Sequence, residues 1–187
     1  MKEFLTHIKR LTQLNEIEVS ELTKILEINT YSKGDIILNT NKINRKLYFI
    51  DKGLVKVSFF TEDKEFVMKF FYENEFCAVL DSLTTGKPSN YRITALTSVN
   101  LIEIDFERLK KLVSKHPPFG KIISGIPSMA SQKMMSRIRE LLETDAKERY
   151  LNFLNTNGHL MKFISLKDLS AYLGITQVTL SRIRAEI

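Results

Sequence analysis

The spacing of apolar residues divides the chain into a helical start, an extended middle and a helical end. In residues 1–29, apolar residues recur every three or four positions with polar residues between them, which predicts packing helices. Asn15 and Ser20 are candidate N-caps for the second of these helices. The apolar positions that carry this pattern are Leu11, Leu14, Ile17, Leu22, Ile25 and Leu26.

Between about residues 30 and 105 the pattern becomes one of short β-branched and aromatic runs separated by turn residues. The turns include Lys33-Gly34-Asp35, residues 51–53 and residues 62–64. A spacing of about ten residues between runs favours an antiparallel sandwich, roll or barrel. A helical pattern within 75–87 predicts a short insertion. The predicted strands are 36–38, 47–50, 54–60, 66–71, 91–96 and 100–104.

Beyond Asp105 the pattern is helical again. One helix is predicted over Phe106–Lys115, and a longer one extends to about Glu143, with a kink or break expected at Pro127. After this proline one face of the helix is apolar. This face either packs on its own domain or pairs with a second copy of the chain. It consists of Ala130, Met134, Ile138 and Leu141 with Leu142 beside them, and Ile122, Ile123 and Met129 are candidate extensions.

The last 44 residues contain the most specific pattern. Thr144 is the predicted N-cap of a helix with acidic residues in its first turn. Further on, Ser165 and Asp168 form a near capping box, Gly174 can adopt the positive φ of a tight corner, and Thr176 can cap the next helix. A glycine corner followed by a capped second helix is typical of a DNA-binding helix-turn-helix.

The helix that follows Thr176 has two different faces. At 100° per residue, Leu180 and Ile183 fall on one side, where they can pack inward. The opposite arc carries Gln177, Val178, Ser181 and Arg182, with Arg184 beside it. Arginine pairs with guanine, glutamine with adenine, and valine contacts a thymine methyl. This arc is either a base-contacting surface, completed by Arg184 and Thr176, or an ordinary solvated helix face.

Taken together, these segments make the chain resemble the CRP/FNR family of bacterial transcription regulators over nearly its whole length. Residues 33–35 and 47–57 are similar to the family's β-roll signature, 145–150 to the start of its DNA-binding domain, and 169–184 to its helix-turn-helix. The resemblance implies an α+β fold. Its parts are an antiparallel β-roll effector domain flanked by helices (1–115), a dimerisation helix and linker (116–143), and a helix-turn-helix domain (144–187). It assigns base contacts to Gln177, Val178 and Arg182.

The sequence departs from the family members that bind cyclic AMP. Those members offer a glutamate for the ribose and an arginine–serine pair for the cyclic phosphate. The corresponding positions hold Val79, Ser89 and Asn90. Valine cannot accept a hydrogen bond from the ribose, and serine cannot supply the charge-assisted fork that arginine offers to a phosphate. Arg92 lies nearby, but three residues beyond Ser89 in a strand it points to the opposite face. We therefore expect no control by cyclic AMP, and an unidentified small-molecule effector stays a candidate partner.

Other cofactors are not predicted. An iron–sulfur cluster needs several cysteines, and Cys77 is the one cysteine of the chain. The candidate axial ligands for a haem, His7, His116 and His159, are scattered along the sequence. No metal site is expected. The sequence contains none of the common catalytic motifs, such as a nucleophile elbow or a P-loop, so we do not expect an enzyme.

Composition adds little to this interpretation. The 187 residues carry a net charge of +6, and residues 116–187 hold 10 basic and 6 acidic residues, a mild bias that suits a nucleic-acid partner. There is no signal peptide and no apolar run of about 20 residues, which predicts a cytoplasmic protein without membrane contact.

The sequence thus predicts a transcription regulator that binds double-stranded DNA at an inverted repeat as a homodimer, with RNA polymerase a candidate partner. The alternative is a ligand-binding sensor module whose helix-turn-helix is vestigial. The sequence given ends at Ile187, three residues after Arg184, before the β-hairpin wing that follows this helix in the family. We therefore expect weak binding of DNA. The operator, the regulated genes and the sign of regulation are not predictable from these residues.

Overall fold

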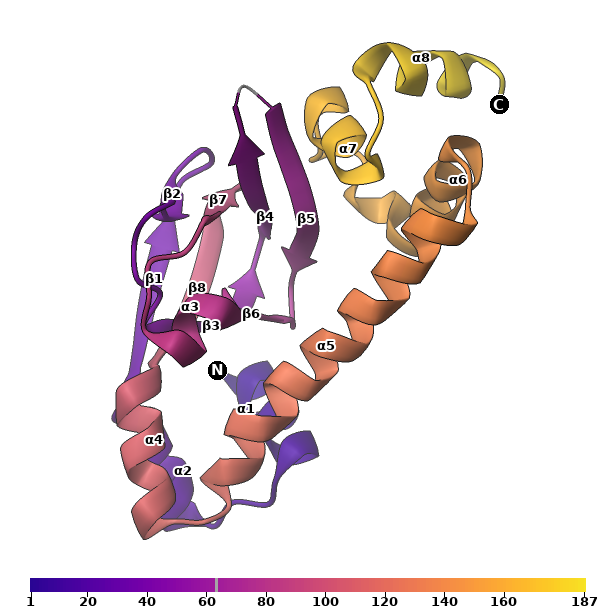
Figure 1. Cartoon of the computed structure of the whole chain (residues 1–187). Coiled ribbons are helices and arrows are strands. Elements are labelled where there is room, and N and C mark those ends of the chain that lie inside the picture. Colours follow the sequence, from indigo (N-terminus) through magenta and orange to yellow (C-terminus); the bar gives the residue numbers. More distant parts are fainter. Residues whose placement is uncertain (63) are drawn as a thin grey trace.

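The computed structural model describes residues 1–62 and 64–187, and its elements follow the predicted order (Figure 1). Helices α1 (Lys2–Leu11) and α2 (Glu16–Thr23) come first. The strands are β1 (Leu26–Tyr31), β2 (Ile36–Leu38), β3 (Lys46–Lys52), β4 (Leu54–Thr61), β5 (Lys64–Tyr72), β6 (Phe76–Cys77), β7 (Tyr91–Ala95) and β8 (Val99–Asp105), with α3 (Leu80–Thr85) before β7. The remaining helices are α4 (Phe106–Lys115), α5 (Phe119–Glu143), α6 (Ala146–Asn157), the 3-10 turn η1 (Gly158–Leu160), α7 (Leu166–Leu173) and α8 (Gln177–Ala185).

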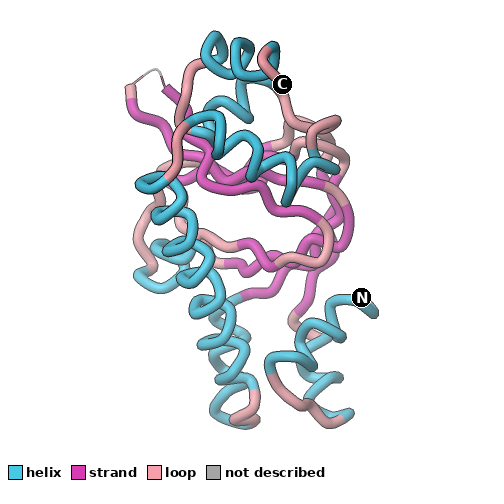
Figure 2. The backbone as a smooth tube through the Cα atoms, turned by 90° about the vertical axis from the view of Figure 1, so that its right-hand side faces the viewer, coloured by secondary structure: helices cyan, strands magenta, loops and turns pink. Residues whose placement is uncertain are grey.

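The strands form two four-stranded antiparallel sheets that face each other (Figure 2). One sheet has the order β1-β8-β3-β6 and the other β2-β7-β4-β5. Their inner faces meet in an apolar core that includes Ile50 and Leu101 from the first sheet and Val55 and Ile93 from the second. Alternation along each strand sends the intervening residues outward. The predicted α+β fold with an antiparallel β-roll is confirmed.

A second apolar core lies on the outer face of the first sheet. Phe49 of β3 and Ile104 of β8 point outward there and pack against Phe4 of α1, Leu109 of α4 and Phe119 of α5. These helices therefore cover the sheet that carries β1, and they attach the N-terminal half of α5 to the roll.

Helix α5 is continuous from Phe119 to Glu143 and contains Pro127 in its interior. Of the two outcomes predicted at Pro127, a kink or a break, the break does not occur. Proline removes one hydrogen bond of the helix, but Ile122 and Ile126 are buried in the second core and hold the helix against the roll on the N-terminal side of the proline. Ile122 is fully buried within its own chain, so it does not extend an intermolecular face.

Two further predictions fail in the first sheet. Residues 26–29 were expected to be helical, yet they begin β1, which pairs with β8 over six positions from Leu26↔Ile104 to Tyr31↔Val99. The short strand β6 also had no counterpart among the predicted strands. Both depend on a partner strand distant in sequence, and such pairing overrides local helical spacing. The middle residue of the predicted turn at 62–64, Asp63, lies outside the described residues.

The cap at the start of α6 also differs from the prediction. Asp145 is the N-cap, and a capping box joins it to Glu148. Thr144 instead ends α5, where its hydroxyl donates a hydrogen bond to the carbonyl of Glu140. Thr144 and Asp145 alone separate α5 from α6, so the long helix leads almost directly into the C-terminal helices.

The C-terminal helices share a third core with the outer face of the second sheet. Leu54 of β4 and Phe70 of β5 pack with Phe153 of α6, Leu173 of α7 and Leu180 of α8. Figure 1 shows α7 beside the β4–β5 hairpin. The helix-turn-helix is therefore docked on the roll.

Candidate nucleic-acid interface and effector cavity

The corner between α7 and α8 has the geometry that the sequence predicted. Gly174 has a φ of 73°, in the left-handed region, and a Cβ at this position would have nothing within 4 Å. The requirement for glycine is thus conformational rather than steric. The amide of Ile175 donates to the carbonyl of Ser170 at 3.1 Å, which closes the corner. The hydroxyl of Thr176 accepts a hydrogen bond from the amide of Thr179 and caps α8.

Helix α8 turns its apolar side inward and its polar side outward. Leu180 and Ile183 are buried in the third core. The residues of the predicted DNA-binding set are solvent-exposed: Thr176, Gln177, Val178, Ser181, Arg182 and Arg184. Within residues 1–62 and 64–187, neither Arg182 nor Arg184 lies within 4 Å of a carboxylate. Both guanidinium groups are thus available to a partner outside the chain.

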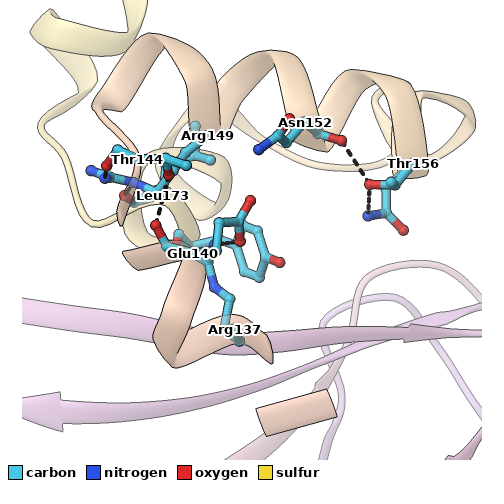
Figure 3. A network of polar contacts seen from close by, with 9 residues as sticks. Arg137, Glu140, Thr144, Arg149, Asn152, Thr156 and Leu173 are labelled. Atoms are coloured by element: carbon cyan, nitrogen blue, oxygen red, sulfur yellow. Dashed lines mark hydrogen bonds and ion pairs between the residues drawn. The ribbon is translucent and has the colours of Figure 1, made fainter. Parts of the chain in front are cut away.

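Two arginines hold the C-terminal end of α7 (Figure 3). Arg149 of α6 donates a hydrogen bond from Nε to the carbonyl of Leu173 at 3.0 Å. Arg137 of α5 donates to the carbonyl of Tyr172 and pairs with Glu140. Helix carbonyls carry partial negative charge at this end, which favours cations. No pattern in the sequence indicates this role for Arg137, whose side chain is only 13% exposed.

A charge cluster joins α7 to the roll. Lys56, on the outer face of β4, has its Nζ 2.5 Å from Asp168 Oδ1 and 2.7 Å from Glu65 Oε1 of β5. The three side chains are almost fully buried. Sequence reasoning missed this cluster, although a lysine in the middle of an apolar strand is a signal, since buried charges are nearly always paired.

The C-terminal half of α5 presents an apolar arc to solvent. Met134, Ile138 and Leu141 of the predicted face are exposed, and Ala130 is half-buried. Leu142, predicted beside this face, is 81% exposed, and the arc is wider than predicted because Met135 is also 66% exposed. Met135 was missed, since it lies 100° around the helix from Met134.

The four residues of the predicted effector cassette do not line one common cavity. Val79 is buried at the start of α3, Ser89 is fully buried with its hydroxyl accepting a hydrogen bond from the amide of Tyr91, and Asn90 is exposed. The guanidinium of Arg92 donates to Asn39 Oδ1 at 3.1 Å and lies 4.5 Å over the ring of Phe60. Of the four, Val79 alone lines the cavity described next.

A cavity of about 1200 Å³ lies between the roll and α5. Its lining includes Phe71 and Tyr91 from the roll. Three charged groups meet at its wall, where Glu75 Oε1 accepts hydrogen bonds from Lys69 Nζ at 2.9 Å and from Lys133 Nζ of α5 at 3.0 Å. Burial lowers the pKa of the Lys69 ammonium. The cavity is large enough for a small molecule. Its wall combines apolar side chains with a cluster of one carboxylate and two ammonium groups.

Three other features bear on the predictions. The thiol of Cys77 is buried between the sheets, and this burial raises its pKa. Within the residues that the structure describes, no three His, Cys, Asp or Glu side chains are grouped so that they could hold a metal ion. The helices of this part of the chain are too short or too polar to cross a membrane.

This architecture is similar to that of known proteins. The model of the cyclic nucleotide-binding domain family matches residues 28–116. The global nitrogen regulator of Synechococcus elongatus is 26% identical, with 95% of this chain and 85% of the relative covered.

Solved structures agree with the fold. FixK2 from Bradyrhizobium japonicum superposes with a TM-score of 0.75 at 16% sequence identity. The superposition covers 87% of this chain and 84% of the FixK2 chain. The c-di-GMP responsive global regulator CLP of Xanthomonas campestris superposes with a TM-score of 0.73 at 18% identity, covering 90% and 89% of the two chains.

The class of protein is therefore a cyclic nucleotide-binding-type β-roll joined by a long helix to a helix-turn-helix. Residues 28–116 are thus a cyclic nucleotide-binding-type domain, and the chain as a whole has the fold expected from its resemblance to the CRP/FNR family. The relative from Synechococcus elongatus and the structural neighbour CLP are both described as global regulators.

Proposed function

We propose that this regulator binds an inverted-repeat DNA site as a homodimer and that cyclic AMP does not control it. The observation that carries the proposal is the two-sided character of α8. The apolar side of α8 packs in the third core, and the opposite arc is exposed to solvent. A capped helix held in this way, with two exposed arginines on its outer side, fits the major groove.

Each residue of the arc has a role in this proposal. Arg182 contacts a guanine through its N7 and O6 atoms, and Gln177 contacts a second base. Val178 packs against a thymine methyl, and Ser181 adds a hydrogen bond. Arg184, beside the arc, binds a phosphate of the DNA backbone. Thr176, at the N-terminus of α8, also lies at a backbone phosphate.

The homodimer would form through α5. Ala130, Met134, Ile138 and Leu141 would pack against the same residues of a second copy across a twofold axis. Met135 and Leu142 would widen this contact. An exposed apolar arc of this length on a helix is a feature of interaction surfaces, and we assign residues 116–143 to this dimerisation helix and linker, between an effector domain (1–115) and the DNA-binding domain (144–187).

Cyclic AMP does not suit the cassette. Its phosphate would meet the Asp81 carboxylate, which lines the cavity near α3, and Arg92 is engaged with Asn39 on the outer face. An unpaired phosphate near a carboxylate is unfavourable. We propose a different small molecule as the effector, and RNA polymerase as a protein partner in the cytoplasm.

The experiment is selection of bound fragments from random double-stranded DNA at low salt. We expect an inverted repeat whose half-sites lie about 34 Å apart, or one helical turn. Low salt matters because phosphate contacts weaken steeply as salt rises. Failure to enrich any sequence would reject the proposal and favour the alternative, a sensor module with a vestigial helix-turn-helix.

A further inference from the structure

The contact between the roll and α7 contains a charge pair that DNA binding as proposed above does not use. Asp168 is fully engaged: Oδ1 pairs with Lys56 Nζ at 2.5 Å, and Oδ2 accepts a hydrogen bond from the hydroxyl of Ser165 at 2.7 Å. Glu65 supplies the second carboxylate to Lys56 from within the same sheet. The pair therefore joins two parts of the chain that are 112 residues apart.

This pair makes the docking of α7 directional. Apolar contact in the third core favours burial without specifying one orientation. A displacement of α7 that keeps this contact dry would leave the Asp168 carboxylate without its counter-charge in a poorly solvated place, which is strongly unfavourable. Movement of α7 away from the roll would leave Asp168 without Lys56, so the structure resists that movement.

A second anchor acts at the other end of the same helix. Arg137 of α5 donates to the carbonyl of Tyr172, in the last turn of α7. Asp168 lies in the first turn. One end of α7 is thus tied to the roll and the other to the long helix. The axis of α7 is fixed by both, and α8 follows rigidly through the corner at Gly174.

We propose that Lys56 and Asp168 are positioning residues that set the distance between the two recognition helices of the dimer. The spacing of half-sites is then determined by the roll as well as by α5. This inference rests on the proposed function. A recognition helix free to move about residues 144–145 would accept a range of spacings, whereas a docked helix accepts one and loses less conformational freedom on binding.

The test compares two matched variants. Asp168→Asn and Glu65→Gln each remove one carboxylate charge beside Lys56, but only the first acts on the pair that crosses to the helix-turn-helix. Affinity is measured for the selected inverted repeat, for repeats with one or two base pairs added or removed between half-sites, and for a single half-site. The parent chain and Glu65→Gln should prefer one spacing. In Asp168→Asn the ratio of affinities for the preferred and the altered spacings should fall about tenfold. The affinity of this variant for a single half-site should change by less than about twofold.

A second pair of variants changes Lys56 instead, so that the result does not depend on whether a substitution at position 168 disturbs folding. Lys56→Arg keeps a cation that can reach both carboxylates and should retain the spacing preference, whereas Lys56→Met should lose it. Circular dichroism confirms that each variant is folded.

Equal losses for the single half-site and for the full site would overturn the proposal, because they would indicate a general effect on stability. The same relaxation of spacing in Glu65→Gln would also overturn it. If the parent chain binds no DNA, the proposed function fails, and hydrogen exchange then decides the docking alone. Faster exchange of the α7 amides in Asp168→Asn but not in Glu65→Gln supports the anchor, and equal exchange rejects it.

Discussion

The guanidinium group of Arg137 lies 4.0 Å over the ring of Tyr172 and also donates a hydrogen bond to the carbonyl of that residue. The other side of the contact is aromatic. The ring of Tyr172 lies 5.3 Å from the rings of both Phe70 of β5 and Phe153 of α6, centroid to centroid. Four elements, α5, α6, α7 and β5, therefore meet at one side chain, which connects the long helix with the roll and the helix-turn-helix.

Replacing Arg137 should measurably destabilise the chain. Arg137→Met removes a charged hydrogen bond and a cation–π contact, and we expect a loss of about 2 kcal/mol in the free energy of unfolding by urea. The control is Arg139→Met on the same helix. Arg139 is largely exposed and pairs with Glu143 at 3.5 Å, so its loss should cost less than about 0.5 kcal/mol. Equal effects of the two variants would mean that the contact with Tyr172 contributes nothing.

A charge in the exposed arc of α5 should prevent association. Ile138→Glu would place a carboxylate in the proposed twofold contact, where burial without a partner is unfavourable. We expect a dimer for the parent chain and a monomer for the variant at micromolar concentration, measured by light scattering after size exclusion. Ile17→Glu is the control, because Ile17 is 68% exposed on α2, away from the arc. A monomeric parent would show that the arc is not a dimer contact.

The two arginines of α8 should differ in their effects on DNA binding. Arg182→Ala should cost about 1–3 kcal/mol per half-site and relax the preference at one base position. Arg184→Ala should weaken binding to all sequences alike and reduce the salt dependence, because a phosphate contact carries no sequence information. Fluorescence anisotropy over a salt series, with fragment selection for each variant, measures both effects. An unchanged base preference in Arg182→Ala would contradict the assignment of α8 as the recognition helix.

Calorimetry should detect no regulatory binding of cyclic AMP. Hydrogen bonds to charged groups contribute about 1.5–3 kcal/mol each, and the residues at the cassette positions, Val79, Ser89 and Asn90, include no cation to pair with a phosphate. A micromolar dissociation constant with one site per chain would refute this expectation and would require Arg92 to leave Asn39.

Stability should fall at alkaline pH. Burial, together with the hydrogen bond that Tyr31 donates to Glu103 at 2.6 Å, raises the pKa of the Tyr31 phenol to about 12. In the unfolded chain this phenol titrates near pH 10. Its contribution is therefore complete below about pH 10 and is lost as the pH rises through about 12.

The variant Tyr31→Phe tests this contribution. The free energy of unfolding, measured in urea at several pH values between 9 and 12, should fall less steeply with pH than in the parent chain. The dependence should not vanish, because burial also raises the pKa of Tyr48 and Tyr172. A slope identical to that of the parent would contradict the role assigned to Tyr31.

The sequence by itself determined the elements whose signals are local. The strands of the roll other than β1 and β6 follow from alternation and turn residues, and α4 begins and ends where its apolar spacing and the prolines at 117 and 118 place it. The corner at Gly174 follows from one glycine and one cap. The inward face of α8 follows from helical geometry, because Leu180 and Ile183 share one side whatever they pack against.

Tertiary structure decided what depends on partners distant in the chain. Residues 26–31 become a strand because β8 offers an edge, and α5 passes through Pro127 because the roll holds the helix before it. The choice of Asp145 over Thr144 as N-cap is set by where α5 ends. Lys56 in an apolar strand signals that a partner is needed, but the sequence does not identify Asp168 as that partner, since the two meet only once the sheet and α7 have packed together.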